Sequence, residues 1–87
     1  MRRVARRDGN EQEIVEALEA IGVVVIRLSD PGVPDLLCYR HDRGWLPIEV
    51  KKKGEPLTPA QLALRERVMF PVVRSVEEAL ELYGVKP

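Results

Sequence analysis

Cysteine, histidine and aromatic residues are scarce in this chain of 87 residues, which has one Cys, one His, one Trp, one Phe and two Tyr. One cysteine cannot form an internal disulfide. Cys38 and His41 together supply too few ligands for the usual zinc site of small domains. We therefore expect Cys38 to be a buried small hydrophobic residue in a reducing compartment. We interpret His41 as a solvated turn residue rather than a general base.

Long apolar runs are also missing. No stretch approaches the roughly 20 apolar residues that a membrane-spanning helix needs. The basic start "MRRVARR" is followed by "DGNEQE" and not by the apolar core of a signal peptide. These absences predict a cytoplasmic protein that is not secreted and has no membrane partner.

A net charge is absent too, because 14 basic and 14 acidic residues cancel. The charges are unevenly distributed, however, and a polyanion responds to local basic groups more than to their sum. The basic groups lie in an N-terminal arm, residues 1–9, and after an apolar segment: Arg2, Arg3, Arg6, Arg7, Lys51, Lys52 and Lys53. They could bind phosphates as a flexible arm and a basic loop, or they could be a frayed terminus and a solvated loop edge.

The length predicts a single domain spanning residues 1–87, since chains rarely divide below roughly 100 residues. Apolar residues make up 45% and charged residues 32% of the chain, which is typical of a globular protein. A domain of this size buries only about 60 to 65% of its unfolded surface, so self-association would add stability.

Helical spacing of apolar residues predicts a first helix over residues 11–21. Asn10 is expected to cap its start, and Gly22 to end it. The β-branched run "VVVIRL" that follows predicts a short buried strand.

The rest of the chain continues with alternating elements. Strands are predicted over "DLLCYR" and "GWLPIEVK", joined by a short polar link as an antiparallel hairpin. The segment "TPAQLALRERV" predicts a helix with Thr58 at the N-cap and Gln61 at the third position, "FPVVRS" a short strand, and "VEEALELYG" a last helix capped by Ser75. The order αβββαβα indicates an α/β class with an α+β mixed sheet.

Three charged residues interrupt the apolar pattern of the hairpin. Alternation puts Trp45, Glu49 and Lys51 on one face of a strand, and the hairpin could bring Asp35 beside them. Two adjacent carboxylates repel each other unless they share a proton or a cation, and hard oxygen ligands suit Mg²⁺ or Mn²⁺. A neighbouring lysine can orient an attacking water, which is phosphodiester hydrolysis in outline.

A simpler interpretation of these residues stays open at this point. Glu49 and Lys51 could form an exposed ion pair worth at most ~1 kcal/mol, with Asp35 merely starting a strand. Trp45 could stack on a nucleotide base, but packing under a helix is its expected role.

Two motifs carry a resemblance to a known family. "PD" at Pro34 and Asp35, followed by "IEVKKKGEPLTPAQ", resembles the PD-(D/E)xK nuclease signature and, more narrowly, the VRR-NUC (virus-type replication-repair nuclease) family. The likeness extends to "NEQEIVEALEAIG" and "VVRSVEEALELY" and so covers nearly all the chain from Asn10 onward. It implies a restriction-endonuclease-like core and a viral or bacterial origin.

The resemblance implies a role for each matching residue. Asp35 and Glu49 would ligate Mg²⁺ or Mn²⁺ together with the backbone carbonyl of Val50. Lys51 would position the nucleophilic water and stabilise developing negative charge.

Two further residues match the family and also have structural interpretations. Glu11 matches an acidic residue near the metal site, yet it could be a first-turn acid favoured by the helix dipole. Gln61 matches a glutamine suited to hydrogen bonding near the lysine and the phosphate, yet a capping box would use the same side chain.

The resemblance therefore implies a divalent-metal-dependent DNA endonuclease, expected to be a homodimer that acts on branched DNA as Holliday-junction resolvases do. DNA contacts are expected from Arg2, Arg3, Arg6, Arg7, Lys52 and Lys53. The rival interpretation is a non-catalytic or partner-dependent nucleic-acid-binding module with the same fold.

Overall fold

The computed structural model describes residues 9–86, which form seven elements. In chain order they are α1 (Gly9–Ala20), β1 (Val24–Arg27), β2 (Leu36–Arg40), β3 (Gly44–Val50), α2 (Pro59–Arg65), β4 (Val72–Val73) and α3 (Val76–Glu81). The predicted order αβββαβα is confirmed. The four arginines of the N-terminal arm lie outside the described residues.

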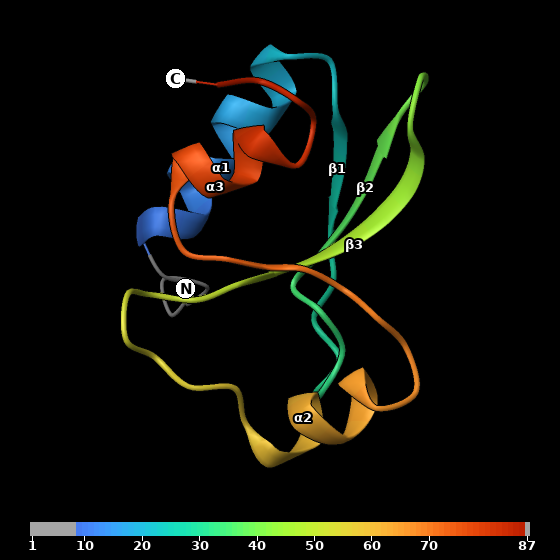
Figure 1. Ribbon diagram of the computed structural model, residues 1–87, viewed down its shortest axis with the longest axis vertical. Helices are drawn as coiled ribbons and strands as arrows, with labels where there is room; N and C mark the ends of the chain where they lie inside the picture. Colours follow the sequence, from blue (N-terminus) through green and yellow to red (C-terminus); the bar gives the residue numbers. More distant parts are fainter. Residues whose placement is uncertain (1–8, 87) are drawn as a thin grey trace, which may run out of the picture.

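The four strands form one mixed sheet in the order β1-β2-β3-β4 (Figure 1). The first three strands are antiparallel neighbours, and β4 runs parallel to β3 through only two residue pairs. The β2–β3 hairpin closes tightly, with Arg40 opposite Gly44, as the polar link between them predicted.

The core lies between one face of the sheet and the pair α1 and α3, which pack against each other (Figure 1). Alternate residues of β2 and β3 point into this core, and Leu36, Cys38 and Ile48 are fully buried there. Burial raises the pKa of the Cys38 thiol to about 11, so Cys38 is an inert core residue, as expected.

The prediction that "VVVIRL" forms a buried strand is wrong. The segment does form β1, but β1 is an edge strand of the sheet, with Val24 56% and Ile26 43% exposed. A β-branched run favours extended structure on any strand, and its hydrophobicity does not say where in the sheet the strand lies.

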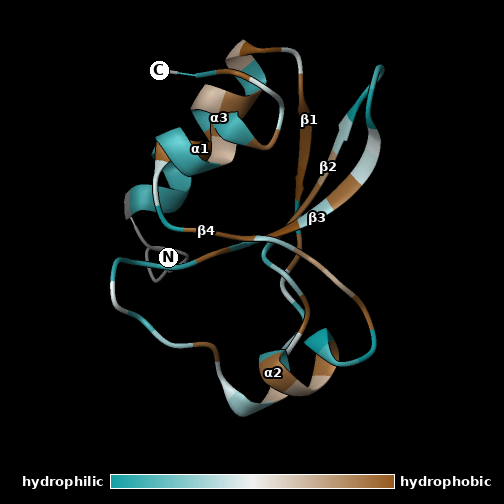
Figure 2. Cartoon of the chain, viewed as in Figure 1, coloured by the Kyte–Doolittle hydropathy of each residue, from teal (hydrophilic) through white to brown (hydrophobic). Residues whose placement is uncertain are grey.

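Residues 9–86 leave the sheet face opposite α1 and α3 largely uncovered. The pairing register aligns six apolar residues on it in two rows across three strands: Val24, Tyr39 and Trp45, then Ile26, Leu37 and Pro47. We call these six residues the open sheet face; the apolar stretches of its strands are coloured brown in Figure 2. Trp45 is 59% exposed, so the expectation that it packs under a helix is wrong; its ring instead contacts Tyr39, with centroids 4.9 Å apart.

The ends of α1 differ in part from prediction. Asn10 lies inside the helix rather than at its N-cap, and its side-chain amide donates to the carbonyl oxygen of Lys51, 3.0 Å away. Gly22 ends the helical turn with φ of 87°, a conformation that favours glycine. Among residues 9–86, no helix has both the length and the apolar character that crossing a bilayer requires.

Replacing Leu36 with Ala tests the core. Because Leu36 is fully buried between the sheet and the helices, Leu36→Ala should lower the free energy of unfolding by about 2–5 kcal/mol. The same change at Leu62, which is 53% exposed on α2, should cost about 0.5 kcal/mol or less. Urea denaturation of both variants measures this, and equal losses would contradict the described core.

Candidate active site

A cavity of about 430 Å³ opens at the end of β3, between the start of α1 and the start of α2. Its walls come from five segments of the chain: Glu11, Leu28, Ser29, Asp30, Val33, Asp35, Glu49, Val50, Lys51, Glu55 and Gln61. Five of these side chains are acidic and one is a lysine, so the cavity is strongly polar.

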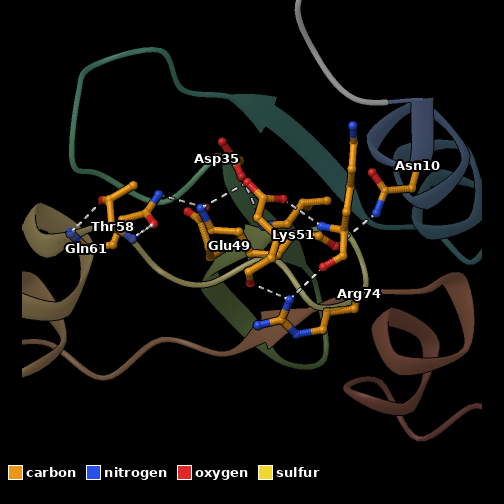
Figure 3. Close-up of polar contacts among 10 residues, drawn as sticks. Asn10, Asp35, Glu49, Lys51, Thr58, Gln61 and Arg74 are labelled. Atoms are coloured by element: carbon orange, nitrogen blue, oxygen red, sulfur yellow. Dashed lines mark hydrogen bonds and ion pairs between the residues drawn. The ribbon is translucent and has the colours of Figure 1, made fainter.

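Asp35 reaches this cavity from the loop that precedes β2. Its carboxylate oxygen Oδ2 accepts a hydrogen bond of 3.0 Å from the backbone N–H of Val50, so it lies across the end of β3 (Figure 3). The register of β2 and β3 accounts for this position, because Leu36 pairs with Ile48 and the preceding residue therefore meets Glu49.

Glu49 and Lys51 point to the same side of β3, as the alternation predicted. The Lys51 Nζ lies 3.6 Å from Glu49 Oε2. Only 1% of Glu49 and 5% of Lys51 is exposed, so they are not a solvated surface pair. Removing two charges from water costs several kcal/mol per ion, and the attraction within a buried pair is often too small to offset that cost. Burial of this pair is therefore weak evidence for a role in stability.

Gln61 makes both of the contacts that the sequence left as alternatives. Its carbonyl oxygen accepts a hydrogen bond of 2.9 Å from the N–H of Thr58, which completes the capping box at the start of α2. Its amide nitrogen donates to Glu49 Oε2, also at 2.9 Å (Figure 3). The cap fixes the side chain and thereby directs its N–H group at the buried carboxylate.

The environment of Glu49 favours its protonated form. Burial, then the charge of Asp35, raises the pKa of Glu49 from 4.5 to about 7, while Lys51 opposes the shift. Among the described residues, Glu49 Oε1 is buried and has no hydrogen-bond partner. A buried acceptor without a donor is unfavourable unless a proton or a cation binds there.

This donor set fits a divalent cation. Two adjacent carboxylates supply hard oxygen atoms, and one of these atoms is without a partner in the part of the chain that is described. Within residues 9–86 no three His, Cys, Asp or Glu side chains are clustered to enclose a metal ion. The set therefore suits an ion such as Mg²⁺, which keeps several of its waters, better than one that needs a full protein cage.

Glu11 lines the same cavity from the first turn of α1 and is 4% exposed. Its Oε2 forms an ion pair of 3.2 Å with Arg27 Nε, at the end of β1. Glu11 is thus both a first-turn acid and a wall of the site, and the guanidinium group fixes where its carboxylate lies.

The other described candidates do not line the cavity. Lys52 and Lys53 are exposed in the loop after β3, and His41 is exposed in the hairpin turn, as expected. Because the arginines of the N-terminal arm fall outside residues 9–86, they have no described position relative to the site.

Two residues of the site were not anticipated from the sequence. Glu55 lines the cavity, and its Oε2 lies 3.6 Å from Lys51 Nζ. Arg74, beyond β4, donates to backbone carbonyls of the loop that carries Glu55. Gly54 in "KKGE" is a turn signal that could have indicated the return of Glu55 toward Lys51. No local pattern points to Arg74.

Neutralising Glu49 should make the metal-free protein more stable at alkaline pH. The pKa of Glu49 is raised in the folded state, so its contribution to stability is complete below its ordinary pKa of 4.5 and is lost as pH rises through about 7. We expect the melting temperature of the wild type to fall relative to Glu49→Gln between about pH 5 and about pH 8. The variant should melt several degrees higher at the upper pH. If the melting temperatures of the wild type and Glu49→Gln changed equally with pH across this range, the described environment of Glu49 would be contradicted.

Comparison with known proteins gave one informative match. No protein-family model matches the chain, and no curated protein sequence does. A solved structure described as a VRR_NUC domain aligns with a TM-score of 0.70 and 31% sequence identity over 85% of this chain and 89% of that one. The alignment confirms the expected PD-(D/E)xK-like nuclease fold with its mixed sheet. The chain therefore belongs to the VRR-NUC family.

Proposed function

We propose that this nuclease-type domain is a divalent-metal-dependent DNA endonuclease that hydrolyses phosphodiester bonds. The observation that carries the proposal is the buried carboxylate of Glu49, which lies beside Asp35 and Lys51 and has one oxygen without a partner among the described residues. An arrangement so costly to bury is expected where a cation and a phosphate bind.

Asp35, Glu49 and the carbonyl oxygen of Val50 would hold Mg²⁺ or Mn²⁺, with Glu11 as a possible further contact. The N–H and C=O of one strand residue point to the same side, and the Val50 N–H is directed at Asp35. The Val50 carbonyl is therefore expected to face the same carboxylate. A bound cation would neutralise the two carboxylates and withdraw electron density from the scissile phosphate.

The remaining side chains would act on the water and the phosphate. The Lys51 ammonium group can donate a hydrogen bond to the attacking water and oppose the negative charge that develops on the phosphate oxygens. Gln61 holds the Glu49 carboxylate in one orientation through its hydrogen bond. Because both groups are fixed before DNA binds, little reorganisation is needed during the reaction.

A non-catalytic or partner-dependent nucleic-acid-binding module is the alternative. Such a module would gain nothing from keeping Glu49 and Lys51 desolvated at a cost in stability. The buried charges therefore favour the enzyme.

A homodimer acting on branched DNA is the second part of the proposal, and the open sheet face supports it. This face carries no acidic or basic side chain among its six residues. Two copies can therefore meet about a two-fold axis without repulsion between like charges. A polyanion would not be drawn to the same uncharged surface. A second copy of the chain is the occupant that fits it best.

DNA would contact basic residues elsewhere on the molecule. Lys52 and Lys53 are exposed in the loop that borders the cavity, and Arg2, Arg3, Arg6 and Arg7 are the further expected contacts. The acidic helix α3 packs against α1 and lies away from α2 (Figure 1). Two active sites related by a two-fold axis would suit the symmetric strands of a four-way junction.

Cleavage of labelled four-way junction, splayed-arm and linear duplex DNA tests the enzyme directly. We expect cleavage with Mg²⁺ or Mn²⁺, and none with EDTA. Lys51→Ala should lower the rate by about 10²-fold to 10⁴-fold, because it removes a group acting on the water and the phosphate. The matched control Lys86→Ala removes an exposed lysine and should cleave as the wild type does. Binding without cleavage under every metal would establish the alternative module.

Charging the open sheet face tests the dimer. The wild type should elute with twice the mass of one chain in size-exclusion chromatography with light scattering. Trp45→Glu should shift it to a monomer, because the interface would bury two uncompensated carboxylates. Leu62→Glu changes a similarly exposed apolar residue outside this face and should leave the mass unchanged. A wild type that elutes as a monomer would refute the homodimer without bearing on the chemistry.

A further inference from the structure

The ammonium group of Lys51 is held between two carboxylates. Its Nζ lies 3.6 Å from Glu49 Oε2 and 3.6 Å from Glu55 Oε2. The Lys51 side chain is 6% exposed, whereas that of Glu55 is 39% exposed. Glu55 is thus the solvent-exposed partner of Lys51, and Glu49 is the buried one.

The position of Glu55 is fixed by a tight turn. The N–H of Glu55 donates to the carbonyl oxygen of Lys52 at 3.0 Å, and Gly54 supplies the positive φ of 81° that this turn needs. In return, Glu55 Oε1 accepts a hydrogen bond of 2.8 Å from the N–H of Lys52. One carboxylate oxygen is therefore anchored on the backbone, and the other faces Lys51. The hydrogen bond to Lys52 is the main cause of a lowered pKa at Glu55, so the carboxylate is charged.

Arg74 fastens the same turn to the end of β4. Its Nη1 donates to the carbonyl oxygens of Lys52 and Glu55, at 2.6 Å and 2.7 Å (Figure 3). The backbone N–H of Arg74 itself donates to Glu78 Oε1 at 2.6 Å, which ties this strand end to α3. The turn that carries Glu55 is thus attached to the folded core by a residue far along the chain.

We propose that Glu55 is a positioning residue of the active site, which holds the Lys51 ammonium at the cavity while Arg74 holds the Glu55 turn in place. This inference rests on the proposed nuclease function. A lysine side chain has four methylene groups joined by rotatable single bonds, so its ammonium group can occupy many positions unless it is held. One carboxylate partner leaves the ammonium group free to turn about that contact, whereas two partners restrict its position. Glu55 then acts through Lys51, without touching DNA or the cation.

Chemical modification of the lysines tests the contact without any nuclease activity. We would treat the full chain with limiting acetic anhydride and measure acetylation of Lys51, Lys52 and Lys53 by mass spectrometry. Lys51 should react most slowly, because it is buried and paired. Glu55→Gln keeps an acceptor for the Lys52 N–H but removes the charge, and should speed acetylation of Lys51 about fivefold relative to its neighbours. Glu66→Gln, a neutralised exposed glutamate on the α2 side, is the matched control. An unchanged Lys51 rate in Glu55→Gln would overturn the proposal.

Kinetics separate positioning from a purely structural role. Glu55→Gln should lower kcat about tenfold with KM changed less than twofold, since the group acts on the reacting step and not on DNA affinity. Glu55→Asp keeps the charge and should be closer to the wild type, and Arg74→Gln should lower kcat in the same direction. A loss that appears only in KM, or that follows the melting temperature of each variant, would overturn the proposal.

Calorimetric titration with Mn²⁺ separates positioning from metal ligation. Glu55→Gln should bind Mn²⁺ as the wild type does, and a lost affinity would show that Glu55 is a ligand instead. A wild type that cleaves no DNA would refute the proposed function. The acetylation result would still decide whether Glu55 holds Lys51.

Discussion

The burial of Glu49 beside Asp35 is the constraint around which the rest of the site is arranged. A desolvated carboxylate next to a second carboxylate is unfavourable, and the raised pKa of about 7 expresses that cost. The surrounding groups each reduce it in part: the Gln61 amide donates a hydrogen bond, and Lys51 supplies an opposite charge. One oxygen of Glu49 is still without a partner in the described chain. The fold thus compensates this carboxylate incompletely, and a buried acceptor without a donor favours the binding of a proton or a cation.

The two faces of the sheet carry different kinds of residues. One face is closed by α1 and α3 and holds the apolar core. The other face carries the charged residues at the end of β3 and the open sheet face along the remainder of the strands. Because side chains alternate along β3, the same register places its core residues on one face and its site residues on the other. A slip of one residue would put Glu49 into the core and Ile48 into the cavity.

Much of the fold and of the candidate site could be predicted from local patterns. Capping residues, glycine stops and alternation gave the order of elements, the hairpin register and the meeting of Asp35, Glu49 and Lys51. What failed depends on contacts between distant segments. Nothing local indicates that Val24 lies on an edge strand, or that Trp45 is largely exposed. Asn10 suits an N-cap by type, but its contact with the Lys51 carbonyl is a tertiary one, 41 residues away.

Gln61 and Glu55 illustrate how so short a chain can build a site without spare residues. Each carries a structural hydrogen bond on one side-chain atom and faces a charged site residue with another. Such double use ties the geometry of the site to the same capping box and turn that form the backbone around it. A domain of this size buries little surface, so it has few residues to devote to a separate supporting layer. Changes that disturb these local motifs should therefore affect the site before they affect the core.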